Sequence, residues 1–246
     1  MVLLKTKSSG ILYLIPNVIA NEDSNQVNTG IILPVLQKIS VLFAEDLRNA
    51  RRFIRSLDPG FNLERLVMHS IGKHADMIEI SGVLSSLPEG SECGLISEAG
   101  MPCIADPGNI IVMEAHRIGM RVIPIQGPNS IILALAASGF SGQKFAFHGY
   151  LPVNRNERIQ SIREIESNAY KLHQTQIFME TPFRNNTLLD DILKTCRNET
   201  ILCIAANITA SNEYIQTAPV REWKNKRPDL HKQPAIFLIY KNDDFF

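Results

Sequence analysis

The chain has 246 residues, 45% of them hydrophobic, and it carries 25 basic and 25 acidic side chains for a formal net charge of zero. This length and apolar content can fill one large core or two small ones. Proteins that coat bare nucleic acid are usually basic, because phosphate neutralisation dominates their affinity, so the charge balance argues against that class. It still allows an enzyme that touches RNA through a local basic patch.

The cysteines and the amino terminus carry no sign of a metal or a membrane segment. The cysteines form no CxxC pair and no Cys/His cluster, and each stands in an apolar stretch, which predicts buried, reduced thiols: Cys93, Cys103, Cys196 and Cys203. The first apolar run, Ile11–Ile15, is too short for a signal or a membrane span. We therefore expect a cytoplasmic protein with no membrane segment and no metal site.

The first half alternates short apolar runs, loops with Gly, Pro or Asp, and helical patterns. Consecutive apolar positions predict strands buried on both faces, as in a parallel sheet covered by helices: Ile11–Ile15, Val41–Ala44, Cys93–Ser97 and Arg121–Ile125. Helices are predicted at Ile110–Ile118 and Ser130–Ser138, each after a Gly/Pro loop and each followed by a glycine. Strand, loop and helix start in this order place backbone N–H groups at a crevice, so we expect a ligand at the strand ends.

The second half has shorter spacing between strands. Strands are predicted at Phe145–Tyr150, Gln176–Glu180, Ile201–Ala206, Tyr214–Thr217 and Ala235–Tyr240, with helices from Asn154 to about Ser167 and near Asn185–Cys196. This density indicates a mixed sheet. The pattern pauses at residues 141–144, and we expect two α/β domains, residues 1–142 and 143–246.

The most informative segment is Gly94–Gly108, which reads GLISEAGMPCIADPG. It combines a buried strand, an acidic residue, a glycine-proline turn and an Asp-Pro-Gly sequence before a helix. Glycines permit close approach of a ligand to the backbone, and prolines stiffen the loop. Taken alone, the segment also fits an ordinary loop between a strand and a helix.

The combination of segments is more specific. Five occur in order: LYLIP at 12–16, FAEDLR at 43–48, SEAGMPCIADPG at 97–108, VIPIQGPNS at 122–130 and FHGYLP at 147–152. In order, spacing and wording they resemble the small-subunit ribosomal-RNA cytidine 2′-O-methyltransferases, members of the tetrapyrrole methylase superfamily. The resemblance extends from Leu12 to about Tyr240, and its most specific part is Ser97–Gly108.

The resemblance implies two α/β domains of tetrapyrrole-methylase type, with S-adenosylmethionine in the cleft between them. Carried over by position, the residues expected to bind this cofactor are Pro16, Glu98, Ala99, Gly100, Met101, Pro102, Ile104, Ala105, Gly127, Pro128, Asn129, Ser130, Ile131, Met179, Glu180, Ala205, Ala206, Asn207, Pro234 and Ala235. Methyl transfer depends largely on positioning, yet a ribose hydroxyl is a weak acid and benefits from a base. Glu98 and Asp106 are the candidates for that catalytic role.

The sequence also departs from the family pattern. The family's aspartate is Glu98 and its threonine is Met101, and the loop PNVIAN at 16–21 has Ala20 where the family has glycine. The family's A-R-E-L-T-K segment appears as AANITA at 205–210, so three charges are missing from one loop.

These departures leave the acceptor open. Ribosomal RNA in the small ribosomal subunit is the leading expectation, supported by arginines within Glu45–Arg55 and by the basic residues of Arg221–Lys232, although both segments also fit solvated surfaces. The alternatives are methylation of a tetrapyrrole or other small molecule, and a degenerate relative that binds S-adenosylmethionine without turnover. The resemblance further implies a homodimer.

Overall fold

The computed structural model describes residues 10–20, 27, 29–72 and 76–241. The chain divides into two compact units, Met1–Asn129 and Ser130–Phe246, and each contains one five-stranded sheet. Asn21 of the first loop and most of the altered segment after it lie outside the described residues. The α/β class predicted from the sequence is confirmed in both units.

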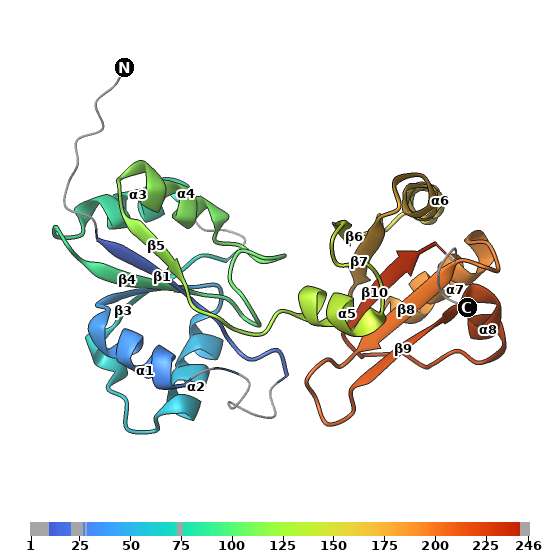
Figure 1. Ribbon diagram of the computed structural model, residues 1–246. Coiled ribbons are helices and arrows are strands. Elements are labelled where there is room, and N and C mark those ends of the chain that lie inside the picture. The colour runs from blue at the N-terminus through green and yellow to red at the C-terminus, as the bar shows by residue number, and fades with distance from the viewer. Residues whose placement is uncertain (1–9, 21–26, 28, 73–75, 242–246) are drawn as a thin grey trace, which may run out of the picture. The chain divides into compact units, whose positions relative to one another are not determined.

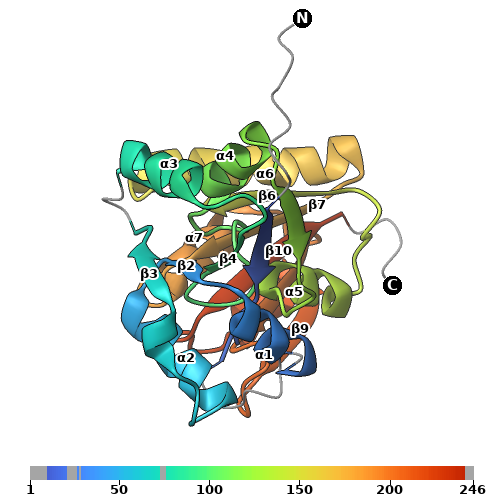
Figure 2. The ribbon, with the colours of Figure 1, turned by 90° about the vertical axis from the view of Figure 1, so that its left-hand side faces the viewer.

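The first unit is a parallel sheet covered on both faces. Its strands, in spatial order, are β3 (Val67–Ser70), β2 (Val41–Ala44), β4 (Glu92–Ile96), β1 (Ile11–Ile15) and β5 (Arg121–Pro124), and every pair is parallel. Helices α1 (Thr29–Lys38) and α2 (Leu47–Leu57) pack on one face, and α3 (Met77–Ser86) and α4 (Asn109–Arg117) pack on the other (Figures 1 and 2). A single 3-10 turn, η2 (Leu63–Arg65), precedes β3. Burial on two faces explains the unbroken apolar runs of the central strands.

The second unit contains a mixed sheet. Its strands, in spatial order, are β6 (Phe145–Tyr150), β7 (Thr175–Glu180), β10 (Ala235–Tyr240), β8 (Ile201–Ala206) and β9 (Tyr214–Pro219). Only β6 and β7 are parallel, and the other neighbours are antiparallel. Helix α5 (Ser130–Ser138) packs on one face, and α6 (Arg155–Leu172), α7 (Asn185–Thr195) and α8 (Val220–Asn225) pack on the other. The mixed sheet expected from the strand density is therefore present.

Helix α5 explains why the compact units divide at Asn129 and Ser130, whereas the expected domains divide at residues 142 and 143. Ile131, Ala134 and Leu135 of this helix share a core with strand residues of the second sheet, including Ile177 and Cys203. The helix follows the last strand of the first sheet in the chain, so sequence order alone suggested that it belonged there. Packing of its apolar face assigns it to the second unit.

The predicted strands and helices agree closely with the structure, and the missed elements have separate physical causes. Strand β3 was not predicted because it is an edge strand whose residues are half-buried or exposed, so it has no apolar run. Helix α1 contains Pro34, which weakens a helical pattern. Helix α6 reaches Leu172, five residues beyond the predicted end, and His173 then adopts a left-handed conformation with φ of 48°.

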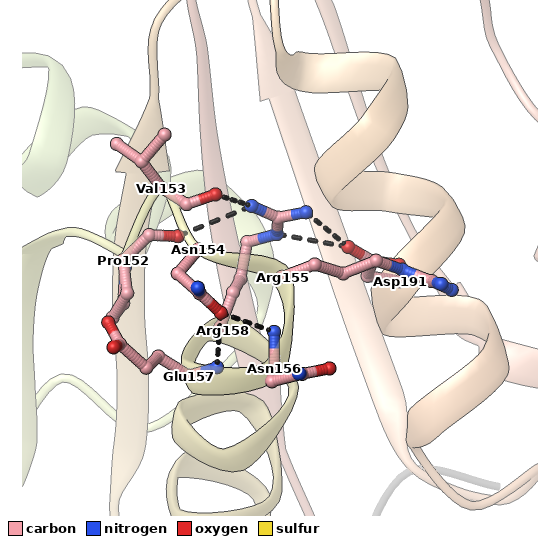
Figure 3. Close-up of polar contacts among 8 residues, drawn as sticks. All are labelled: Pro152, Val153, Asn154, Arg155, Asn156, Glu157, Arg158 and Asp191. Carbon is pink, nitrogen blue, oxygen red and sulfur yellow. Dashed lines mark hydrogen bonds and ion pairs between the residues drawn. The ribbon is translucent and has the colours of Figure 1, made fainter.

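The start of α6 is held by a buried ion pair (Figure 3). Arg158 is 5% exposed and donates from Nη2 and Nε to Asp191 of α7, at 2.7 and 3.0 Å. It also donates to the backbone carbonyls of Pro152 and Val153, at 3.3 and 2.8 Å. The side chain of Asn154 caps the helix by accepting from two backbone N–H groups of its first turn. These contacts fix the segment that follows β6, which is the end of the FHGYLP segment.

Three further properties concern the described residues as a group. None of the helices there is both long and apolar enough to cross a lipid bilayer. Three of the four cysteines are buried and Cys103 is half-buried, and all four are free thiols. Within the same part of the chain, no three His, Cys, Asp or Glu side chains gather in a way that could hold a metal ion.

Candidate functional site

All strands of the first sheet are parallel, so their carboxyl ends lie along one side of the sheet, which we name the first-unit edge. Strands β4, β1 and β5 are adjacent in the sheet, so the loops that follow them are neighbours. These loops contain Pro16, Ser97–Gly108 and Gly127–Pro128, the positions expected from the sequence to face a cofactor. The topology therefore brings the first-unit candidates together at the edge where open α/β sheets bind ligands.

Asn17 joins the first two of these loops. It is 3% exposed, and its Nδ2 donates to the carbonyl oxygens of Ser97 and Glu98 at 3.2 and 2.9 Å. Its backbone N–H donates to the Gly100 carbonyl at 2.9 Å, and the Gly100 N–H donates back at 3.1 Å. Sequence reasoning did not select Asn17. Its one signal was a polar residue placed directly after a buried strand and a proline.

Two glycines permit the loops to approach one another closely. Gly100 has φ of +67°, and a Cβ there would lie 3.1 Å from the Pro128 carbonyl oxygen. A Cβ on Gly127 would lie 2.1 Å from Cβ of Pro16, so any side chain at this position would force the loops apart. Pro16 is buried against Gly127, and its ring serves the packing of the loops.

The Ser97–Gly108 loop has an unusual backbone. Besides Gly100 and Gly108, the non-glycine residues Cys103 and Ala105 have positive φ, of 69° and 62°. Such conformations cost about 1–3 kcal/mol each and persist where the surroundings fix them, often at functional sites. Ile104 lies between these two residues and is 44% exposed. The loop therefore exposes an apolar side chain and solvent-accessible backbone at this edge of the sheet.

The predicted residues of this loop differ in accessibility. Glu98, Ala99, Ile104 and Ala105 are exposed, Met101 is half-buried, and Gly100 and Pro102 are buried. The exposed residues are the ones that a bound molecule can reach directly. The buried ones shape the loop.

A cluster of carboxylates lies at the same edge. The pKa of Asp106 is raised to about 7 by burial first and then by the negative charges of Glu45 and Glu98, while a hydrogen bond with Ser97 opposes the shift. The Glu98 backbone N–H donates to Oε2 of Glu45 at 3.4 Å, which links the loops after β2 and β4. A carboxyl group with a pKa near neutrality is suited to exchange a proton at physiological pH.

The second unit assembles its candidates through strand register. Ala235 of β10 pairs with Glu180 of β7 and with Ala206 of β8. Tyr150 of β6 pairs with Met179 in the neighbouring row. All seven second-unit candidates named from the sequence therefore lie along one edge of this sheet: Met179, Glu180, Ala205, Ala206, Asn207, Pro234 and Ala235.

These residues face different sides of the sheet. Met179 and Ala205 belong to the core on the α5 side, while Ala206 and Ala235 belong to the core on the α6 and α7 side. The Glu180 carboxylate is occupied within the protein, since it accepts from the Thr181 backbone N–H and from Arg184 Nη2, both at 2.6 Å. Glu180 therefore fixes the turn that follows β7.

The AANITA loop is held through Asn207 and through the Thr209 backbone N–H, which donates to the Glu213 carboxylate at 2.7 Å. Asn207 has φ of 50°, and its backbone N–H donates to the Pro234 carbonyl at 2.9 Å. Its Nδ2 donates to Oε1 of Gln233 at 2.8 Å. The loop that lacks the family's charges is thus an ordered part of the sheet edge. Residues Asn129, Ser130 and Ile131 lie where the two units meet in the chain, with Ile131 in the second-unit core.

Helix α2 begins beside the carboxylate cluster and carries a stripe of arginines. Positions i, i+3, i+4 and i+7 share one helical face, and here they are all exposed arginines: Arg48, Arg51, Arg52 and Arg55. The opposite face is buried through Ala50, Phe53 and Ile54. In the part of the chain that the structure describes, none of the four arginines forms an ion pair. The stripe is a concentrated positive surface on a chain of zero net charge.

Comparison with known proteins agrees with this architecture. A family model described as tetrapyrrole (corrin/porphyrin) methylases matches residues 33–224. The chain is 30% identical over 236 residues to ribosomal RNA small subunit methyltransferase I of Escherichia coli O157:H7, covering 94% of this chain and 78% of that protein. It is 30% identical over 238 residues to the protein of the same name from Pseudomonas aeruginosa, covering 94% and 79%.

Solved structures show the same fold. The methyltransferase CobJ matches with a TM-score of 0.60 and 13% identity, over 95% of each chain. The uroporphyrin-III-C-methyltransferase of Thermus thermophilus matches with a TM-score of 0.52 and 19% identity, over 95% of this chain and 93% of that one.

Proposed function

We propose that this chain, which belongs to the tetrapyrrole (corrin/porphyrin) methylase family and is a methyltransferase, methylates a ribose 2′-hydroxyl of small-subunit ribosomal RNA with S-adenosylmethionine as donor. The observation that carries the proposal is the identity of 30% across 94% of the chain to proteins named ribosomal RNA small subunit methyltransferase I. The geometry of the first-unit edge supports it independently of the names.

The residues at that edge fit the proposed cofactor. S-adenosylmethionine carries a positive sulfonium and a positive ammonium, and when bound it supplies an electrophilic methyl group. The exposed carboxylate of Glu98 and the nearby carboxyls of Glu45 and Asp106 complement positive charge. Ala99, Ile104 and Ala105 offer small or apolar contact and open backbone. Glu98–Pro102 and Ile104–Ala105 would hold the cofactor from the first unit, with Met179 and Ala205–Asn207 as the corresponding second-unit residues.

Asp106 is the proposed base. As the ribose oxygen gains the methyl group it must lose its proton, and the Asp106 carboxylate would accept that proton. A pKa near 7 makes the group partly ionised at neutral pH while keeping it basic enough to take a proton. Glu98 and Glu45 assist by repulsion, since their charges raise the pKa of Asp106.

The arginine stripe on α2 is the proposed contact for RNA phosphates. Guanidinium groups bind phosphate oxygens through two parallel hydrogen bonds, and a row of them follows a nucleic-acid backbone. The stripe starts one turn from Glu45, so it adjoins the carboxylate cluster in the same unit. A local patch of this kind reconciles an RNA substrate with zero net charge.

The direct test is transfer of labelled methyl groups to unmodified small-subunit ribosomal RNA transcribed in vitro, both free and assembled into subunits. A 2′-O-methylated nucleotide blocks alkaline cleavage of the following phosphodiester, so the product is recognised by an alkali-resistant dinucleotide. Glu199→Gln, an exposed site in the second unit, serves as a control for loss of one carboxylate. Transfer into a tetrapyrrole or another small molecule, with none into RNA, would replace the proposed acceptor. Cofactor binding without transfer to any fraction would indicate a degenerate relative.

We also propose that the protein is a homodimer, on resemblance to the family. Gel filtration with light scattering should give about twice the chain mass of 27.5 kDa. A mass near that of one chain would rule the dimer out.

A further inference from the structure

An exposed aromatic ring stands on the turn that follows β7. Phe183 is 69% exposed, one of the largest values among the large hydrophobic side chains of the described residues. It forms an edge-to-face contact with the ring of His231, with centroids 6.2 Å apart and planes at 75°. His231 is itself exposed and precedes β10. The pair, which we name the Phe183 platform, lies at the same edge of the second sheet as Glu180 and Ala235.

The two segments that carry these rings are fixed to one another. The Lys232 backbone N–H donates to the Pro182 carbonyl at 3.0 Å, and Asn185 Nδ2 donates to the Gln233 carbonyl at 2.6 Å. Asp229 accepts from Asn186 Nδ2 at 2.7 Å and from the His231 N–H at 2.9 Å.

The turn is also fixed by an ion pair between Arg184 and the Glu180 side chain, which is 1% exposed. These contacts hold the large apolar ring of Phe183 in water, where it contributes nothing to folding stability through burial.

Most polar groups of the turn are paired within the protein, and two atoms are exceptions. In the described part of the chain, two buried side-chain atoms lack a hydrogen-bond partner: Nε of Arg184 and Oδ1 of Asn185. One is a donor and the other an acceptor, and both flank Phe183 on the same turn. Native proteins rarely leave such atoms unpaired, and those that remain call for a specific reason.

The residues around the platform indicate which kind of molecule it binds. Lys232 places an exposed positive charge next to His231 in the chain, Arg184 beside Phe183 is paired with Glu180, and Thr181 and Asp229 make the border polar. The apolar area is that of a single ring, which is too small for a protein interface. A planar, polar-edged group linked to phosphates matches this arrangement, because proteins bind unpaired RNA bases by stacking them on exposed aromatic rings beside cationic side chains.

We propose that the Phe183 platform stacks an unpaired base of the RNA substrate, with Lys232 contributing to the adjacent phosphate. This inference rests on the proposed RNA substrate and adds a site of base contact in the second unit. Stacking tolerates any base, so the platform contributes affinity and placement of the strand, while the chemistry stays with the residues of the first-unit edge.

Tryptophan at position 183 gives a direct readout. The chain has one tryptophan, Trp223, which is 1% exposed and donates from its indole N–H to the Leu202 carbonyl. Phe183→Trp therefore adds an exposed fluorophore whose emission a stacked base quenches. Titration with unmodified small-subunit ribosomal RNA should quench this emission. Phe145→Trp is the matched control, because Phe145 is 39% exposed and lies at the start of β6, on the opposite edge of the same sheet.

Binding and kinetics complete the test. Phe183→Ala should weaken RNA binding roughly tenfold and raise the KM for RNA by a similar factor, with kcat and S-adenosylmethionine affinity unchanged. Phe183→Trp should restore the affinity, and Phe145→Ala should leave it unchanged.

Equal RNA affinity of wild type and Phe183→Ala, with no quenching at position 183, would overturn the platform while leaving the proposed methylation intact. Quenching and weakened binding without any RNA methylation would support the platform and defeat the proposed reaction. Absence of RNA binding by the wild type would overturn both.

Discussion

The two sheets gather their candidate site residues at one edge by different physical means. In the first unit the strands are parallel, so the edge is made of loops, and these are interlocked by Asn17, Gly100 and Gly127. In the second unit the sheet is mixed, so the edge combines the ends of β7 and β8 with the start of β10. The first edge thus includes the Ser97–Gly108 loop, whereas the second is built largely of strand ends held in register.

The chemical character of the edges differs accordingly. The carboxyl group with a raised pKa, Asp106, belongs to the first edge, whereas left-handed residues occur at both, at Cys103 and Ala105 in the first and at Asn207 and Lys232 in the second. At the second edge, the buried carboxylate of Glu180 is engaged in holding a turn. We infer that the first edge supplies the reactive groups and the second supplies shape, and the following predictions separate these roles.

The largest effect is expected from removal of the proposed base. Asp106→Asn should lower the rate of methyl transfer by about 10²–10³-fold, because it keeps the shape of the side chain and removes its ability to accept a proton. The affinity for S-adenosylmethionine should change less than about threefold. Single-turnover rates and calorimetric titration measure the two quantities.

The pH profile of the wild type checks the same role. Because the pKa of Asp106 is raised to about 7, the transfer rate should rise with pH through neutrality and level off above it. A rate that is flat from pH 6 to pH 8, or an unchanged rate in Asp106→Asn, would contradict a base at this position. Glu199→Gln should behave as wild type.

A smaller effect is expected at the arginine stripe. The double variant Arg51→Glu and Arg52→Glu should raise the KM for RNA about tenfold or more and flatten the dependence of binding on salt, since fewer phosphate contacts release fewer counterions. Arg163→Glu, an exposed arginine on α6, provides the comparison. Equal salt slopes for the double variant and the wild type would exclude α2 as a phosphate contact.

Substitution of Asn207, in the AANITA loop of the second unit, should affect the free energy of unfolding more than the rate of methyl transfer. Asn207→Ala loses a hydrogen bond to Gln233 and places alanine, which tolerates the left-handed region less well than asparagine, at φ of 50°, so we expect about 2 kcal/mol of destabilisation. Asn207→Gly loses the hydrogen bond while tolerating the conformation, so about 1 kcal/mol is expected. Denaturant unfolding gives both values. A methyl-transfer rate that drops beyond about tenfold in the glycine variant would assign this loop a role in chemistry.

The last prediction concerns the contribution of Asp106, the proposed base, to the free energy of unfolding. A carboxyl whose pKa is raised in the folded state binds more protons folded than unfolded, so its contribution to stability declines as pH rises from about 4 to about 7. Asp106→Asn should therefore stabilise the protein above pH 7, by about 1–2 kcal/mol for a partly solvated group, and much less near pH 4. A variant that is less stable than wild type at pH 8 would show that the carboxylate has favourable contacts.

Much of the fold could be predicted because the apolar runs of buried strands are local signals. Val41–Ala44 and Ile201–Ala206 are buried at every position, and both were identified from composition alone. The half-exposed strand Val67–Ser70 carries no such signal and was missed. The assignment of α5 to the second unit depends on which sheet it packs against, which a single apolar helix does not reveal.

The candidate site was predicted as a set of segments but not as a set of contacts. Its key contacts join residues far apart in the chain: Asn17 with Ser97, and Phe183 with His231. The perturbed pKa of Asp106 depends on Glu45, which follows a different strand. Local sequence patterns contain no information on such pairings, so they emerged only from the topology of the sheets.

The most direct test of the account is calorimetric titration with S-adenosylmethionine and S-adenosylhomocysteine of wild type, Gly100→Arg and Gly142→Arg. Gly100 has positive φ and almost no free space, whereas Gly142 is exposed and a side chain there would meet nothing within 4 Å. We predict micromolar binding for the wild type and Gly142→Arg, and none for Gly100→Arg with its fold retained by circular dichroism. Binding that survives in Gly100→Arg would remove the cofactor from the Ser97–Gly108 loop, and no binding by the folded wild type would contradict the proposed methyl donor.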